Sequence, residues 1–175
     1  MHVEGIRDLA PVAASLPKGV VIRPGRREDL DHAEEVDLAI YRIQARAPSF
    51  ASLPLDREAR QAEWLEVDFD EQGLSYVVAE AGGKIVGQSL IFGADPVLGI
   101  GHDAAALVAV SVLEERRGEG IGLALFAEIV RRAVDAGYAR LVTNWRITNL
   151  SASRFWPARG FRPIYHRLHR AIGVG

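Results

Sequence analysis

The segment at positions 104–112 constrains the fold of this chain more than any other part of the sequence. It reads AAALVAVSV, and a run with so little polar alternation is typical of a strand buried on both faces of a sheet. A glycine-rich turn follows, and then a helical pattern that ends at Gly137, a residue suited to the position after a helix C-terminus. The expected buried stripe of this helix is Leu123, Phe126, Ile129, Val130 and Val134.

Residue patterns predict further elements on both sides of this strand–turn–helix unit. A hairpin is expected at residues 74–92, because Gly82 and Gly83 separate two apolar runs. Other strands are predicted at residues 20–25, 139–145 and 161–172, and helices at residues 29–47, 54–69 and 149–160. The predicted order β-α-α-β-β-β-α-β-α-β indicates an α/β (α+β) fold with a mixed central sheet flanked by helices.

The length of 175 residues is typical of one domain. Residues 1–19 are interpreted as an N-terminal extension, since Pro11 and Pro17 interrupt them and Gly19 ends them. Within the extension, Ile6, Leu9 and Ala13 can lie on one face of a short helix that docks on the body. The domain itself is then expected to span residues 20–175.

Charge and composition exclude several classes of protein. The formal net charge is −2, whereas a general nucleic-acid-binding protein usually has a basic excess. The chain has no cysteine, which excludes a disulfide framework, a thiol nucleophile and cysteine-ligated zinc. No window approaches the roughly 18 apolar residues of a membrane span, and the first residues do not resemble a signal peptide. We therefore expect a cytoplasmic protein without nucleic acid, membrane or metal as a partner.

The glycine-rich turn, RRGEGIG at positions 116–122, has the properties of an anion-binding site. It is not a P-loop, since no Lys-Ser or Lys-Thr follows the glycines, and it lacks the spacing of a dinucleotide fingerprint. Glycine lets a ligand approach the backbone closely, and the first amides of a helix have no partner within the helix. The alternative interpretation is a plain strand-to-helix turn, in which glycines only allow close packing.

Two motifs resemble those of the GCN5-related N-acetyltransferase (GNAT) superfamily. Its signature [Q/R]-x-x-G-x-[G/A] is matched by Arg117, Gly120 and Gly122. Downstream, NLSASRFWPARGF at positions 149–161 resembles the N-x-x-A segment, aromatic helix and Gly-Phe of the family. The resemblance covers about residues 20–170 and implies a single domain in which two splayed strands bind acyl-CoA. It also implies transfer of an acyl group to an amine, and dimers are common in the family.

The resemblance implies a set of cofactor-binding residues. Backbone amides of the turn would hold the pyrophosphate, and the preceding strand would pair with the pantetheine arm. Asn149 would contact that arm, although it can equally be a helix N-cap, and Arg154 and Arg159 can meet the 3′-phosphate or remain solvated. The expected set is Val110, Ser111, Val112, Arg117, Gly118, Glu119, Gly120, Ile121, Gly122, Leu123, Asn149, Ala152, Phe155 and Trp156.

The resemblance also suggests catalytic groups. A backbone amide at or near Val112 would polarise the thioester carbonyl. Many members have a tyrosine that protonates the leaving thiolate, but here that position is Trp156, whose indole cannot act as an acid near neutral pH. Tyr165 is the nearest tyrosine in sequence and a candidate acid. A CoA thiol with a pKa near 8.5, judged from free cysteine, can also leave as thiolate without an acid.

An amine acceptor also requires a base. An amine with a pKa of about 10.4 is almost entirely protonated at pH 7, and deprotonating it costs roughly 4.6 kcal/mol. His102 is the candidate base, with Asp103 and Glu80 nearby in sequence, although the segment around His102 can also be a surface loop. His166 and His169 alternate on the predicted last strand without a clear role.

Aromatic residues are candidates for the acceptor pocket, or else belong to the core: Tyr41, Phe50, Trp64 and Trp145. The acceptor itself, a small-molecule amine or a protein amine, cannot be read from these residues. The sequence therefore predicts an N-acetyltransferase that uses acetyl-CoA, or another acyl-CoA, by direct transfer in a ternary complex. The alternative is a non-catalytic acyl-CoA-binding sensor with the same fold, which the replacement at Trp156 suggests.

Overall fold

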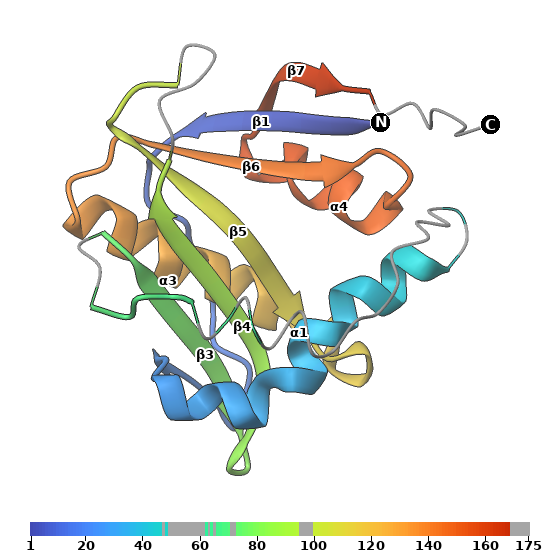
Figure 1. Cartoon of the computed structure of the whole chain (residues 1–175). Helices are drawn as coiled ribbons and strands as arrows, with labels where there is room; N and C mark the ends of the chain where they lie inside the picture. The colour runs from blue at the N-terminus through green and yellow to red at the C-terminus, as the bar shows by residue number, and fades with distance from the viewer. Residues whose placement is uncertain are drawn as a thin grey trace.

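A single mixed sheet organises the computed structural model, which describes residues 1–46, 48, 62, 64, 66–70, 73–94 and 100–168 (Figure 1). The strand order is β2-β3-β4-β5-β6-β1-β7, and only the β5–β6 pair is parallel. The strands are β1 (His2–Asp8), β2 (Val20–Pro24), β3 (Ser75–Ala81), β4 (Lys84–Gly93), β5 (Ala104–Val112), β6 (Arg140–Arg146) and β7 (Arg162–Arg167). The helices are α1 (Leu30–Ala45), α3 (Ile121–Asp135) and α4 (Leu150–Phe155), with 3₁₀ turns at Arg27–Asp29, Glu114–Arg116 and Pro157–Arg159.

Most of the predicted elements are confirmed. The mixed sheet, the β3–β4 hairpin, and helices α1, α3 and α4 lie where the residue patterns indicate. Gly137 has a φ of 87°, as expected for the residue that follows a helix. The helix expected at residues 54–69 falls largely outside the described residues.

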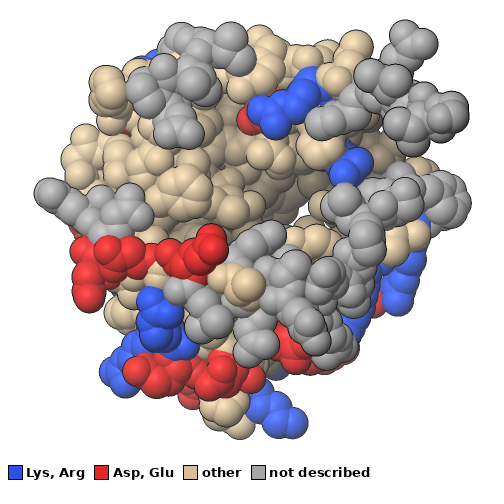
Figure 2. Space-filling model, in the orientation of Figure 1, with Lys and Arg blue, Asp and Glu red and all other residues tan. Residues whose placement is uncertain are grey.

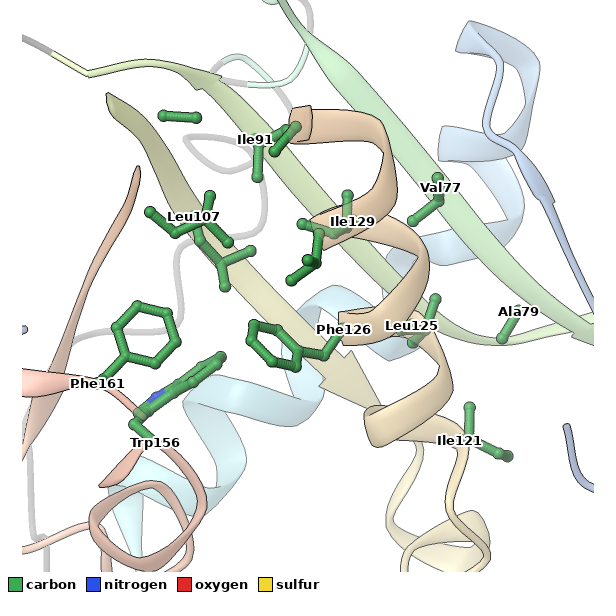
Figure 3. Packing of buried hydrophobic residues seen from close by; sticks show 14 of the residues in the cluster. Val77, Ala79, Ile91, Leu107, Ile121, Leu125, Phe126, Ile129, Trp156 and Phe161 are labelled. Carbon is green, nitrogen blue, oxygen red and sulfur yellow. The ribbon is translucent and has the colours of Figure 1, made fainter. Parts of the chain in front are cut away.

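The helices cover the two faces of the sheet, because side chains of a strand alternate between them. Val77 and Ile91 face α3, in a core that also contains Leu125, Phe126 and Ile129 (Figure 3). Their strand neighbours Tyr76, Val78 and Leu90 face α1, in a second core with Ala33 and Val36. The sheet is therefore the middle layer of three.

The prediction for the first residues is wrong. His2–Asp8 do not form a docked helix but a strand that inserts between β6 and β7. The strand fits because Gly5 has no side chain, and a Cβ at this position would lie 2.6 Å from the ring of Trp145. Residues 2–8 are consequently part of the sheet that the rest of the chain builds.

Two burial predictions need correction. The second half of β5 is not buried on both faces, since Val108 is 54% exposed. In α3, Val134 is 49% exposed and Leu123 is half-buried, whereas Ala124, Leu125 and Ala133 lie in the core. The exposure of Val108 and Leu123 has a physical reason: β5 separates from its neighbour β6, and this opening exposes the strand and the first turn of α3.

Candidate active site

Strands β5 and β6 start as a parallel pair and then diverge (Figure 1). Their ladder joins only Ala104–Ala106 to Arg140–Val142. At the next position the hydroxyl of Thr143 donates to the carbonyl oxygen of Leu107 at 2.8 Å, so a side chain replaces the ladder at the apex of the opening. Beyond this point, no strand among the described residues pairs with the β6 side of β5.

The opening forms a cleft of about 590 Å³. Figure 2 shows a hollow on this face, with Lys or Arg side chains at its rim. Five segments contribute to the walls: the end of β5, the turn before α3, the end of β6, helix α4 and the C-terminal half of α1. The expected cofactor-binding residues that line it are Val110, Ser111, Val112, Arg117, Gly118, Gly120, Ile121, Gly122, Leu123, Asn149, Ala152, Phe155 and Trp156.

The backbone of β5 presents polar groups to this cleft. The carbonyl oxygen of Ala109 accepts from the Ser89 hydroxyl of β4, so Ala109 faces β4. The amide of Leu113 donates to the Val86 carbonyl at 3.0 Å, and backbone groups alternate along an antiparallel pair. The intervening Val110 and Val112 therefore direct their N–H and C=O groups toward the cleft.

The N-terminus of α3 opens on the same cleft. Gly120 is the N-cap residue with a φ of 90°, a conformation that favours glycine, and a Cβ at this position would meet nothing within 4 Å. The amide of Ala124 donates to the Gly120 carbonyl, which leaves the amides of Ile121, Gly122 and Leu123 without a partner in the helix. These donors and the helix dipole make the turn suitable for an anion.

Arginines line the cleft. The Arg117 Nε donates to the Val112 carbonyl at 3.3 Å, and burial lowers the pKa of Arg117 from its ordinary value. Arg146 and Arg159 line the cleft, and each has a buried Nε without a hydrogen-bond partner. The guanidinium of Arg159 also lies 4.2 Å from the ring centre of Phe155. The cleft is thus built for a ligand with negative charge at its mouth.

Helix α4 forms the opposite wall. Asn149 is its N-cap, since the side-chain oxygen accepts from the Ala152 amide at 3.2 Å, and Asn149 also lines the cleft. Trp156 is only 7% exposed, and its ring lies 6.0 Å from that of Phe126 and 5.3 Å from that of Phe161, centre to centre (Figure 3). The ring of Phe155 is 4.9 Å away. Trp156 therefore belongs to the core as well as to the cleft wall.

Several predicted site residues are not brought to the cleft. The Glu119 side chain binds Arg116 instead. His102 is exposed in the loop before β5, about 25 Å of extended strand away from Val110. Tyr165 lies on the edge strand β7, and neither it nor Tyr41 is among the lining residues. Phe50 and His169 lie outside the described residues.

The remaining predicted residues have mixed outcomes. Trp145 is buried in β6 and lines the cleft, whereas Trp64 packs against Tyr76 in the core under α1. Near His102, Asp103 forms an ion pair with Arg140. Glu80 forms an ion pair with Arg23 at 2.9 Å.

Sequence reasoning missed part of the lining. Ile40, Ile43 and Gln44 of α1 are spaced at three- and four-residue intervals, so helical periodicity could have grouped them. His2, Asn144 and Arg146 also line the cleft, and nothing local in the sequence links positions so far apart. Only the pairing of β1 with β6 brings them together.

The opened sheet and the helix N-terminus together define the fold of the GNAT acetyltransferases. The model of the Acetyltransferase (GNAT) family matches residues 38–161, more than two thirds of the chain. This protein therefore belongs to the Acetyltransferase (GNAT) family.

Individual relatives are distant. Probable N-acetyltransferase family 8 member 5 of Mus musculus is 34% identical over 90 residues, which span 50% of this chain and 38% of the mouse protein. The structure of ribosomal-protein-alanine N-acetyltransferase from Brucella melitensis is similar with a TM-score of 0.63 and 25% identity, over 81% of this chain and 84% of that one. The PaiA N-acetyltransferase from Thermoplasma acidophilum, solved in complex with coenzyme A, has a TM-score of 0.64 and 16% identity, over 82% and 89% of the two chains.

Proposed function

We propose that this protein transfers an acetyl group, or another acyl group, from acyl-CoA to a primary amine. The observation that carries the proposal is that one cleft contains both the unpaired side of β5 and the free amides at the N-terminus of α3. The first can bind an extended arm as an added strand, and the second can bind a diphosphate. Membership of the family and a similar structure solved with coenzyme A support the same ligand.

Each part of the cleft then has a role in binding acyl-CoA. The amides of residues 120–123 hold the diphosphate, and Arg117 adds positive charge beside them. The backbone groups of Val110 and Val112 pair with the pantetheine arm, which Asn149 contacts from the other wall. The buried Nε of Arg159 has no hydrogen-bond partner among the described residues, which supports this side chain as the contact for the 3′-phosphate.

The chain's own groups position the reaction. Bound acetyl-CoA supplies an activated thioester, and a backbone amide of β5 donates to its carbonyl oxygen as negative charge develops there. Val112 is adjacent to the glycine turn, where the diphosphate is proposed to bind. The amide of Val110, closer to the apex, is therefore a better candidate for this donor than that of Val112. The chain has no cysteine to carry a covalent acyl group, so direct attack by the amine is the simplest scheme.

The departing thiolate has no obvious proton donor among the described lining residues. Trp156 occupies the position of the family's acidic tyrosine, and Tyr165 lies two strands away from β6, roughly 10 Å across the sheet. CoA therefore leaves as a thiolate, and the second proton of the amine then protonates its sulfur.

The acceptor enters from the side of the cleft that the end of α1 borders, on the face of the sheet opposite α3. Both a small-molecule amine and a protein amine fit an opening of this kind. None of the described helices is long and apolar enough to span a bilayer. A cytoplasmic location and a homodimer stay predictions.

Calorimetry with CoA and an assay of free thiol with acetyl-CoA and a panel of amines test this function. We expect saturable CoA binding and thiol release that depends on one class of amine. Absence of binding at millimolar CoA would contradict the proposed ligand. Binding without amine-dependent thiol release would favour the second candidate, an acyl-CoA sensor, which the inert Trp156 in the acid position suggests.

A further inference from the structure

The walls of the cleft contain no carboxylate among the described residues. Their titratable side chains are His2 and the four arginines Arg116, Arg117, Arg146 and Arg159. An arginine does not accept a proton at neutral pH. Among the described residues, the candidates for a proton acceptor are therefore His2 and a group directly behind the lining.

Strand β1 carries the groups that meet this requirement. Glu4 pairs in register with Asn144 of β6 and with Tyr165 of β7, and His2 pairs with Arg146 and Arg167. Residues paired in this way share a face of the sheet. This face is the one opposite α3, because the alternate residues Val3 and Trp145 pack in the core with that helix. Strand β1 lies beside β6 in the sheet (Figure 1), so its polar side chains His2 and Glu4 extend this face next to the side from which the amine approaches.

Glu4 is a buried carboxylate on this surface. It is 8% exposed, and one of its oxygens lies 3.3 Å from the Arg167 guanidinium. Burial raises the pKa of Glu4 above its ordinary value, and the charge of Arg167 opposes this change. The register of β1 with β7 also shifts between Glu4 and Gly5. Bulges of this kind frequently re-aim a side chain beside a site.

The distances along β6 favour Glu4 over His2. Val142 is the last residue of β6 that pairs with β5. Asn144, the exposed partner of Glu4, is about 7 Å further along the strand, whereas Arg146, the partner of His2, is about 13 Å away. His2 also has arginines as partners on both neighbouring strands, so protonating it would add a third positive charge. Glu4 lies closer than His2 to the point where β5 and β6 separate, and it would accept a proton beside one cation, Arg167.

We propose that Glu4 is the base of the acyl-transfer reaction and that the N-terminal strand supplies it to the acceptor side of the cleft. Its carboxylate takes one proton from the incoming ammonium, directly or through one water. The freed nitrogen pair then bonds to the thioester carbon, the C–S bond breaks with its electrons on sulfur, and the amine's second proton neutralises the thiolate. This inference rests on the proposed function, and β1 lies outside the segment that matches the family, residues 38–161.

The test is the pH profile of kcat/KM for an amine that the wild-type protein acetylates, at saturating acetyl-CoA. We expect Glu4→Gln to lower kcat by about 100-fold or more and to remove the acidic limb of the profile. The affinity for CoA, measured by calorimetry, should stay within about two-fold of wild type. Glu4→Asp keeps a carboxylate and should retain more activity than Glu4→Gln.

A second variant distinguishes a base from a merely structural residue. Arg167→Gln removes the cation beside Glu4, which raises the pKa of the carboxyl further. The acidic limb should then move to higher pH, an effect that loss of packing does not produce. Glu80→Gln is the matched control, because Glu80 of β3 binds Arg23 of β2, near the opposite edge of the sheet, and should leave the profile unchanged.

The outcomes separate this inference from the proposed function. If the wild-type protein acetylates no amine, both fail together. If it is active and Glu4→Gln keeps the wild-type rate and profile, the base assignment is overturned while the transferase function stands. Loss of the acidic limb in His2→Gln, with no change in Glu4→Gln, would likewise overturn it.

Discussion

The guanidinium of Arg116 binds both carboxylate oxygens of Glu119, each at 2.7 Å, across the turn that precedes helix α3. The hydrogen bonds from Arg116 hold the pKa of Glu119 below its usual range. A cation next to the proposed diphosphate site is thereby neutralised within the protein. We therefore expect the free backbone amides of the turn, and not Arg116, to provide most of the binding to the diphosphate.

Replacing Glu119 by Gln should strengthen CoA binding. The substitution removes a negative charge and releases Arg116, so we expect the affinity to rise about two- to five-fold at low salt. Calorimetry at low and high ionic strength measures the effect, which should shrink as salt increases. Glu128→Gln is the control, since Glu128 pairs with Arg131 and Arg132 further along the same helix. Weaker binding in Glu119→Gln would contradict this account of the site.

A side chain at Gly120 should abolish CoA binding. Gly120→Glu places a negative charge in an open position at the helix N-terminus, where the diphosphate is proposed to bind. Its matched control is Gly137→Glu, because Gly137 also has a positive φ and lies after the other end of α3. Both variants strain the backbone by roughly 1–2 kcal/mol, but only the first should lose binding in calorimetry. Normal CoA binding by folded Gly120→Glu would refute the diphosphate site.

The Thr143 hydroxyl should stabilise the apex of the cleft. Thr143→Val keeps the shape of the side chain but leaves the Leu107 carbonyl without its partner, in a buried place. We expect the free energy of unfolding to fall by about 1–3 kcal/mol and acetyl-CoA to bind more weakly. Urea unfolding and calorimetry measure these changes. Thr148 is exposed, so Thr148→Val should change neither, and a stable Thr143→Val with unaltered binding would show that the bond is dispensable.

The role of Trp156 can be tested with two smaller rings. Trp156→Tyr and Trp156→Phe both remove contacts with Phe126 and Phe161, and each should lower the free energy of unfolding by about 1–3 kcal/mol. We expect the kcat of the two variants to agree within about three-fold, because the thiolate can leave without an acid. A gain of ten-fold or more in Trp156→Tyr alone would instead show that protonation of the leaving group limits the rate.

The ion pair of Arg23 with Asp29 should make stability depend on pH. Arg23 donates to both oxygens of Asp29, at 2.7 and 2.8 Å, and these bonds hold the pKa of Asp29 below its usual range. Because the pKa of Asp29 is lower in the folded than in the unfolded state, the ion pair stabilises the fold at pH values above the unfolded-state pKa, which is near 4. This stabilisation is lost as the pH falls through the folded-state pKa of Asp29.

Asp29→Asn should therefore lower the free energy of unfolding at pH 7 by about 1–3 kcal/mol and flatten its decline below pH 4. Chemical unfolding across this pH range measures both effects. Asp31→Asn, an exposed neighbour, should change stability by less than about 0.5 kcal/mol. If the free energy of unfolding of Asp29→Asn falls at low pH as steeply as that of the wild type, other carboxylates cause that decline.

Features that depend on neighbouring residues could be predicted from the sequence. The glycine turn before α3, the Gly82-Gly83 hairpin and the Asn149 cap of α4 were all predictable, because each follows from local backbone preferences and nearby hydrogen bonds. The motifs at residues 117–122 and 149–161 also indicated the family, which the family model confirms.

Predictions that required distant segments to meet were less successful. The imidazole of His102 makes it the candidate base by its chemistry, yet His102 lies in the loop before β5, beside the start of the strand, where β5 and β6 are still paired. The base candidate that the structure offers, Glu4, was hidden in a segment interpreted as a docked extension. Its burial, its neighbour Arg167 and its place beside the cleft all come from strand pairs that join residues more than 130 positions apart.

The sequence by itself thus determined the local elements and the anion-binding turn, because a few adjacent residues set the dihedral angles and free amides there. The tertiary structure decided where β1 inserts, where β5 and β6 separate, and which polar side chains face the resulting cleft. Strand pairing is non-local, and a shift of one residue in register would turn every side chain of β1 to the other face. Glu4 therefore acquires its position from the sheet as a whole and not from its neighbours in the chain.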